Sequence, residues 1–135
     1  MTFVRVYGTI YAPLRRKFTV NRVLVVDDED FMRRLLNDLL TRDNENARVV
    51  FAGSVEEAAT MIGAHDDFGV LLTDFELGDG TGNEVGRRFA EKFPHAVVVG
   101  MTGNPENTFD PGIFKRVLNK PFKAEDKAVL DSLCS

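Results

Sequence analysis

Acidic side chains capable of binding a metal ion end the first strongly apolar run of this sequence. In VLVVDDED (residues 23–30), four apolar residues lead directly into Asp27 and Asp28. A short run bounded in this way predicts a buried strand. Two adjacent carboxylates in a partly desolvated site repel each other unless a cation lies between them, and hard oxygen ligands suit Mg²⁺. The alternative is an acidic first turn of the following helix, which the helix dipole favours by itself.

Three further polar residues stand at the ends of strand-like runs: Asp74, Thr102 and Lys120. Taken singly, each has an ordinary explanation. Asp74 could cap a turn, Thr102 could be a hydroxyl at a strand end, and Lys120 could be a solvated surface charge. In a parallel sheet, however, the carboxyl ends of all strands meet at one edge, where open α/β folds bind their ligands. We therefore expect three carboxylates, one hydroxyl and one ammonium to converge there.

The elements that must position these groups alternate along the chain. We expect strands at 23–26, 48–52, 69–73, 96–101 and 116–119. Apolar residues at helical spacing predict an amphipathic helix of about three turns between the first two strands: Phe31, Leu35, Leu36, Leu39 and Leu40. Capping-box patterns open helices at 55–63 and 82–93, and a last helix covers about 124–133. This order predicts a doubly wound α/β fold, with a five-stranded parallel sheet and helices on both faces.

Two segments do not follow this alternation of strands and helices. Residues 102–115 contain two prolines and two glycines, so a fourth helix there should be short or distorted. Residues 1–21 form an N-terminal extension to the domain at 22–135. Within the extension Phe3, Arg5 and Tyr7 alternate with valines, which predicts an extra edge strand, with a mobile tail as the alternative.

The composition indicates one soluble domain. A chain of 135 residues is long enough for a real core and short for two domains. The net charge of −4 argues against direct nucleic-acid binding and against anionic lipid. With Cys134 as the single cysteine, no disulfide can form within the chain, which favours a reducing compartment. No apolar stretch approaches the ~20 residues of a membrane span, and we expect a cytoplasmic protein.

Five segments resemble motifs of the receiver domain of two-component response regulators, the CheY-like superfamily. The resemblance covers residues 22–133 and lies in VLVVDDED (23–30), FAGSVEEA (51–58), LLTDFELGDGTGNEV (71–85), VVVGMTGN (97–104) and NKPF (119–122). It implies the flavodoxin-like arrangement of the fold expected above. It also implies a phosphoprotein of a phosphorelay, which catalyses its own phosphorylation and dephosphorylation and is otherwise not an enzyme.

The resemblance assigns a role to each site residue. Asp74 would be the phosphoacceptor, and Lys120 and Thr102 would contact phosphoryl oxygens. Gly103 would let backbone N–H groups approach the phosphate, Asn104 would modulate the site beside it, and the bond from Lys120 to Pro121 would be cis. The Mg²⁺ ligands would be Asp28, Asp74 and the backbone carbonyl of Glu76, with Asp27 acting directly or through a water molecule.

The resemblance also implies partners. The phosphoryl donor would be a sensor histidine kinase or a histidine phosphotransfer protein, while the downstream protein stays unidentified and a homodimer is possible. Only fifteen residues follow Lys120, so we expect a stand-alone receiver without an effector module.

Several positions differ from the family pattern. Gly78 replaces a common proline, and Val117 replaces the aromatic switch residue, for which Phe109 or Phe114 could substitute. Glu76 would stand beside the path of the water that removes the phosphoryl group, and we expect it to tune the phosphate lifetime in a direction that the sequence leaves open.

Two other functions are compatible with the sequence. The altered region at 103–117 favours an interaction module that keeps the fold but signals by binding alone. The acid-x-acid sequence Asp74-Phe75-Glu76 is similar to the nucleophile motif of haloacid dehalogenase-type phosphohydrolases, although Gly78 and the chain length speak against that class.

Overall fold

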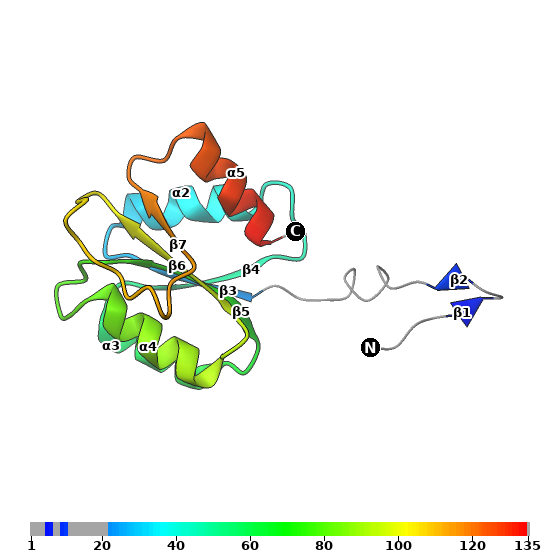
Figure 1. Cartoon of the computed structure of the whole chain (residues 1–135), viewed down its shortest axis with the longest axis horizontal. Helices are drawn as coiled ribbons and strands as arrows, with labels where there is room; N and C mark the ends of the chain where they lie inside the picture. Colours follow the sequence, from blue (N-terminus) through cyan, green and yellow to red (C-terminus); the bar gives the residue numbers. More distant parts are fainter. Residues whose placement is uncertain (1–4, 7–8, 11–21, 135) are drawn as a thin grey trace.

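A five-stranded parallel sheet forms the centre of the computed structural model, which describes residues 5–6, 9–10 and 22–134 (Figure 1). Its strands are β3 (Arg22–Val26), β4 (Arg48–Ala52), β5 (Phe68–Asp74), β6 (Val97–Thr102) and β7 (Arg116–Asn119). They lie in the order β4-β3-β5-β6-β7, and every neighbouring pair is parallel. All five strands lie where the apolar runs predicted them. The predicted α/β fold class is confirmed.

Within the described residues, four helices cover the two faces of this sheet. Helices α2 (Asp30–Thr41) and α5 (Ala124–Leu133) pack on one face, while α3 (Val55–Ala64) and α4 (Gly82–Lys92) pack on the other (Figure 1). The three helices predicted with bounds agree with α3, α4 and α5 to within one residue at each end, and α2 is the amphipathic helix predicted between the first two strands. In the predicted apolar stripe of α2, Leu36 and Leu40 are fully buried, whereas Phe31 is 73% exposed. It stands in the first turn of the helix, at the rim of a pocket rather than over the core.

The core has two layers because side chains alternate along each strand. In β3, Leu24 and Val26 face α3 and α4, whereas Val23 and Val25 face α2 and α5, and all four are fully buried. A parallel sheet covered on both faces requires such continuously apolar strands. The run VLVV is therefore the sequence of a central strand.

The connection between β6 and β7 contains turns and no helix. The sequence predicts a short or distorted helix here, and the structure corrects this to none at all. Pro105 and Pro111 cannot donate a backbone hydrogen bond, which weakens any helix across the segment. The buried rings of Phe109 and Phe114 cover this part of the sheet face instead, and their centroids are 4.6 Å apart.

The N-terminal extension has one described feature. Strand β1 (Arg5–Val6) pairs antiparallel with β2 (Thr9–Ile10) in a separate two-stranded sheet. Arg5–Val6 does not add the predicted edge strand to the five-stranded sheet. Residues 1–4, 7–8 and 11–21, on which the rest of that prediction and its mobile-tail alternative fall, lie outside the described residues. Within the described part of the chain, no helix has the length and apolar character needed to span a bilayer.

Gly82 provides a test of how tightly the sheet and α4 approach each other. A Cβ atom at this position would lie 2.3 Å from the backbone oxygen of Asp74, so the two segments would have to separate. We expect Gly82→Ala to lower the free energy of unfolding by about 1–3 kcal/mol, measured by urea titration.

The matched control is Gly63→Ala in α3, where a Cβ would meet nothing within 4 Å. That substitution should stabilise the protein by about 0.5–1 kcal/mol, because alanine loses less backbone entropy than glycine in a helix. Equal effects of the two substitutions would contradict the close approach.

Candidate functional site

The carboxyl ends of four strands meet around one pocket of about 680 Å³. Strand β3 runs into Asp27 and Asp28, β5 ends at Asp74, β6 ends at Thr102, and β7 is followed by Lys120. Because the strands are parallel, their carboxyl ends share one edge of the sheet. The side chains that the sequence predicts to converge do come together here.

Lys120 is the positive centre of the site. Its ammonium nitrogen lies 2.6 Å from Asp27 Oδ2, 3.2 Å from Asp74 Oδ2 and 3.9 Å from Glu29 Oε1. The Asp27 side chain is fully buried, and that of Lys120 is 12% exposed. A buried carboxylate needs a charged or hydrogen-bonding partner. Lys120 meets this need for Asp27 and also contacts Asp74.

Backbone N–H groups orient the carboxylates of Asp27 and Asp74. Asp27 Oδ1 accepts a hydrogen bond of 2.9 Å from the backbone N–H of Glu29, and Asp74 Oδ1 accepts one of 2.8 Å from Phe75 N–H. In both residues Oδ2 is the oxygen nearest to Lys120. Each carboxylate is therefore held at both oxygens.

The electrostatic environment shifts two pKa values. Burial raises the pKa of Asp74, and the neighbouring charge of Asp27 adds to this rise, while Lys120 opposes it without cancelling it. For Lys120, burial alone would lower the pKa, but the hydrogen bonds and charges of Asp27 and Asp74 outweigh burial and raise it. The site therefore favours the positively charged form of Lys120.

Four carboxylates form a cluster that suits a divalent cation. One oxygen from each of Asp27, Asp28, Glu29 and Asp74 lies within 4.8 Å of the others. Lys120 balances one of these charges, so the carboxylates retain an excess of negative charge. Hard oxygen donors in this number fit Mg²⁺, which usually takes a few carboxylates and keeps several waters. The donor set is therefore compatible with the predicted metal.

The structure modifies the predicted ligand set in one respect. Glu29 belongs to the carboxylate cluster, although it is not among the ligands predicted from the sequence. It is the next acidic residue after Asp27 and Asp28, so the run of acids itself was the available signal. The side chain of Glu76 is exposed and stands outside the cluster, and the ligand role expected of its backbone carbonyl stays a prediction.

The hydroxyl of Thr102 has three hydrogen bonds. It accepts from Asn104 N–H at 3.0 Å and from Asn107 Nδ2 at 2.8 Å, and it donates to the Asn104 carbonyl at 3.1 Å. Asn107 also lines the pocket, and no motif in the sequence indicated this residue. Next to these groups, Gly103 is exposed at the pocket wall.

The remaining predicted positions lie around the site. The peptide bond from Lys120 to Pro121 is cis, as predicted. Gly78 has a φ of 78°, a conformation that glycine adopts readily, in the loop after β5. Val117 is 41% exposed on the edge strand β7. No aromatic side chain occupies that position to respond to the site.

Asp79, in the same loop as Gly78, caps the N-terminus of α3, the helix that precedes β5 in the chain. Its two carboxylate oxygens accept hydrogen bonds from Val55 N–H at 2.9 Å and Glu56 N–H at 3.1 Å, at the start of α3. These backbone donors lower the pKa of Asp79. The cap ties the loop after Asp74 to α3 and so supports the position of the site.

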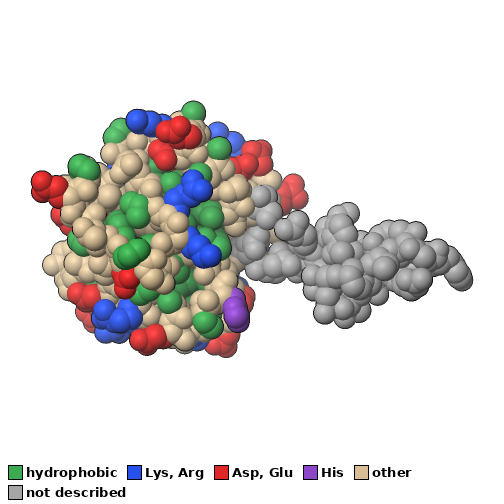
Figure 2. Space-filling model, in the orientation of Figure 1, with side chains coloured by type: hydrophobic (Ala, Val, Ile, Leu, Met, Phe, Trp, Pro, Cys, Tyr) green, Lys and Arg blue, Asp and Glu red, His purple; other side chains and the backbone are tan. Residues whose placement is uncertain are grey.

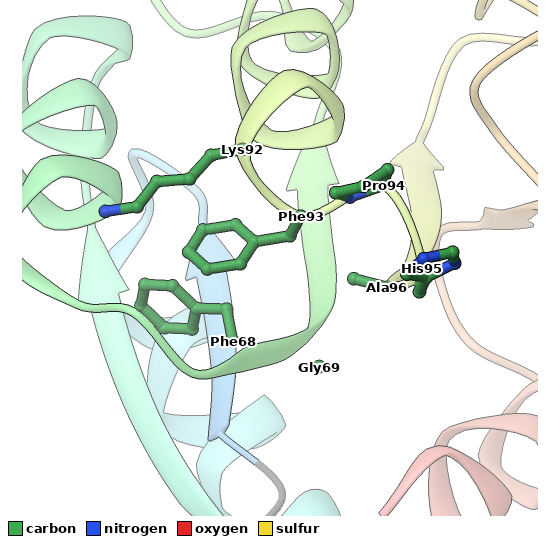
Figure 3. A pocket seen from close by; sticks show the side chains of 7 residues that line it. All are labelled: Phe68, Gly69, Lys92, Phe93, Pro94, His95 and Ala96. Atoms are coloured by element: carbon green, nitrogen blue, oxygen red, sulfur yellow. The ribbon is translucent and has the colours of Figure 1, made fainter.

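A second pocket, of about 350 Å³, lies at the opposite edge of the sheet and is lined mainly by apolar and aromatic groups (Figure 3). Phe68 and Phe93 meet edge to face there, with ring centroids 5.6 Å apart. The ammonium of Lys92 extends away to the carbonyl oxygens of Ile62, at 2.8 Å, and His65, at 2.7 Å. The carboxylate cluster is absent from this lining, so the pocket at the carboxyl edge is the candidate site.

On the face shown in Figure 2, Lys and Arg side chains occur in small groups among acidic and apolar ones. This face presents no continuous basic surface.

The sequence belongs to the response regulator receiver domain family, whose model matches residues 23–128. Among curated proteins it is similar to Sensor protein TorS of Escherichia coli (strain K12), with 24% identity over 108 residues. That match covers 77% of this chain and 12% of TorS. The chain therefore corresponds to a small part of that relative, and the activity of the whole relative does not transfer with it.

Solved structures share the fold. The chemotaxis response regulator CheY4 of Vibrio cholerae has a TM-score of 0.72 and 21% identity, covering 85% of this chain and 99% of that one. A receiver domain protein from Clostridium thermocellum has a TM-score of 0.69 and 23% identity, with coverages of 83% and 91%. A structure described as adenylate cyclase from Rhodopirellula baltica has a TM-score of 0.72 and 28% identity, with coverages of 84% and 87%.

The buried ion pair yields a stability prediction. Lys120→Met removes the cation beside the fully buried Asp27 while keeping an unbranched chain of similar length. We expect the free energy of unfolding, measured by urea titration in EDTA, to fall by about 1–3 kcal/mol, because a buried charge loses its partner.

Lys127→Met is the matched control, since Lys127 is exposed on α5. It should change the same free energy by less than about 0.5 kcal/mol. Equal losses in the two variants would show that Lys120 does not hold the buried carboxylate.

Proposed function

We propose that this receiver domain accepts a phosphoryl group on Asp74 from a phosphohistidine and signals by the change that follows. The observation that carries the proposal is the meeting of the Asp74 carboxylate and the Lys120 ammonium, 3.2 Å apart, within a cluster of four carboxylates. Family membership supports the class of reaction. The similarity to a sensor protein supports a sensor histidine kinase or a histidine phosphotransfer protein as the donor.

The proposed reaction needs positioning more than covalent catalysis. An Asp74 oxygen attacks phosphorus, the bond from phosphorus to the donor imidazole nitrogen breaks, and that nitrogen keeps the electron pair. The product is an acyl phosphate on Asp74 and a free histidine side chain. Phe75 N–H holds one Asp74 oxygen during the attack. As an anionic nucleophile, the carboxylate requires no general base.

Lys120 and Thr102 would stabilise the transferred group. The Lys120 ammonium already contacts Asp74 Oδ2, so it can pair with a phosphoryl oxygen attached there. The Thr102 hydroxyl lines the same pocket and can donate its proton to another phosphoryl oxygen. Charge-assisted hydrogen bonds of this kind are stronger than neutral ones.

Asp27, Asp28 and Asp74 would hold Mg²⁺, with Glu29 at the rim of the carboxylate cluster and the Glu76 carbonyl as a further ligand. When bound, the ion neutralises charge on the carboxylates and on the phosphoryl oxygens. The four acidic side chains balanced by one lysine support this assignment. A cytoplasmic location fits a donor of the histidine kinase type.

A receiver-fold module that signals by binding alone is the second candidate. The missing helix between β6 and β7 and the exposed Val117 favour it, because the usual aromatic route from the site to the surface is altered. In that case Asp74→Asn would leave pathway output unchanged, whereas phosphorylation-dependent signalling requires output to fall.

Phosphorylation of Asp74 can be tested by intact mass. With Mg²⁺ and acetyl phosphate, we expect one phosphoryl adduct per chain. The adduct should be lost in Asp74→Asn and in EDTA, because the nucleophile or the ion is removed. Asp43→Asn, at an exposed aspartate after α2, is the matched control and should keep the adduct. An adduct that survives Asp74→Asn would overturn the assignment.

Glu76 offers a test of the phosphate lifetime. Its exposed carboxylate lines the same pocket as Asp74, so it can accept a hydrogen bond from a water beside the phosphoryl group. We expect Glu76→Gln to slow loss of the adduct about two- to tenfold, the scale of one hydrogen bond. Glu45→Gln, exposed in the loop before β4, serves as the control. Equal rates would remove the role of Glu76, and faster loss would indicate repulsion of water instead.

A further inference from the structure

The Thr102 hydroxyl uses all of its hydrogen-bonding capacity in this structure. A hydroxyl offers one proton and two acceptor lone pairs. Here the lone pairs receive Asn104 N–H and Asn107 Nδ2, and the proton goes to the Asn104 carbonyl. The residue is 3% exposed, so water cannot readily replace these partners. The hydroxyl must break or redirect at least one bond before it can donate to a phosphoryl group on Asp74.

Of the three bonds, the one from Asn107 comes from another part of the segment between β6 and β7. It joins side chains five residues apart at 2.8 Å, the shortest of the three. The backbone N–H of Asn107 bonds the same Asn104 carbonyl that accepts the Thr102 proton, at 3.1 Å. Asn107 is therefore attached both to the hydroxyl and to the acceptor of that hydroxyl.

Beyond Asn107, the segment is anchored to the rest of the domain. Asn83 of α4 donates from Nδ2 to the Thr108 carbonyl and accepts from Asp110 N–H at Oδ1, each at 2.9 Å. The buried ring of Phe109 lies against Phe75, the neighbour of Asp74, with centroids 5.1 Å apart. These contacts leave the stretch 103–107, most of which is exposed, between Thr102 and the anchored carbonyl of Thr108, with the Asn107 bond across it.

We propose that Asn107 is a positioning residue that holds the Thr102 hydroxyl in its unphosphorylated arrangement, in competition with a phosphoryl group on Asp74. The inference rests on the proposed function, because it concerns the same site. When the hydroxyl turns to a phosphoryl oxygen, the Asn107 amide loses its acceptor. The stretch 103–107 then rearranges, while the anchors at Asn83 and Phe109 remain.

Asn107 would link the site to the surface in place of the aromatic switch residue, whose position is held here by the exposed Val117. Binding of a group that favours one arrangement of Thr102 shifts the population of the two arrangements by its difference in affinity. The Asn107 bond contributes part of that difference. Its removal should therefore make the site easier to occupy, whereas loss of a catalytic group would make it harder.

The test uses beryllium trifluoride with Mg²⁺ as a stable analogue of the phosphoryl group, titrated against the full chain by NMR. We expect Asn107→Ala to bind the analogue about two- to tenfold more tightly than wild type, the scale of one net hydrogen bond. Asn107→Ser, which shortens the side chain but keeps it polar, should change affinity in the same direction. Thr108→Ala is the matched control, because its exposed hydroxyl bonds only the Glu106 carbonyl among the described contacts, at 3.4 Å.

A double-mutant cycle separates this role from a general loosening of the segment. In a Thr102→Val background the hydroxyl is absent, so Asn107→Ala should no longer change affinity. In wild type, the side-chain amide signals of Asn107 should shift when the analogue binds. Amide exchange should change over 103–107 and stay constant over 110–119.

The outcomes distinguish failure of the proposed phosphorylation of Asp74 from failure of the role of Asn107. If wild type neither binds the analogue nor forms the acyl phosphate, the proposed function fails and the role of Asn107 fails with it. If wild type binds but Asn107→Ala binds equally or more weakly, only the role of Asn107 is overturned. An equal effect of Asn107→Ala with and without the Thr102 hydroxyl would overturn it as well.

Discussion

The fully buried carboxylate of Asp27, paired with Lys120 at 2.6 Å, is the constraint on which the site depends. Lys120 follows the edge strand β7, whereas Asp27 follows β3, and the strand order places β5 and β6 between them. The lysine side chain must therefore reach across the edge of the sheet, and Asp74 at the end of β5 lies on its path. A stability requirement, the neutralisation of a buried charge, thus places a cation beside the proposed phosphoacceptor.

The segment between β6 and β7 shows how a receiver domain keeps its site without one of its usual helices. Phe109 and Phe114 cover the sheet face there, and Gly100 permits this because a Cβ would lie 2.7 Å from the Phe109 ring. Two asparagines, Asn83 and Asn107, connect the segment to α4 and to Thr102. These two side chains, one from α4 and one from the segment itself, thus provide the attachment that helix packing would otherwise provide.

The fold could be predicted from the sequence because its signals are local and strong. The run VLVV is buried on both faces in the centre of the sheet, and its side chains alternate between two core layers. The convergence of Asp27, Asp74, Thr102 and Lys120 followed from the parallel sheet alone. Phe31 was misplaced, because helical spacing does not tell where a helix extends past the edge of the sheet. The pairing of Arg5–Val6 with Thr9–Ile10 was missed as well, because alternation predicts a strand but not its neighbour.

By itself, the sequence determined the order of strands and helices, the edge at which the acids gather and the family to which they belong, since periodicity and short motifs are written along the chain. Only the tertiary structure decided that Glu29 joins the carboxylate cluster, that Lys120 pairs most closely with Asp27, and that Asn107 occupies the Thr102 hydroxyl. These are contacts between side chains whose geometry depends on how loops close. Loop closure depends on packing across the whole domain, and no local pattern of residues records it.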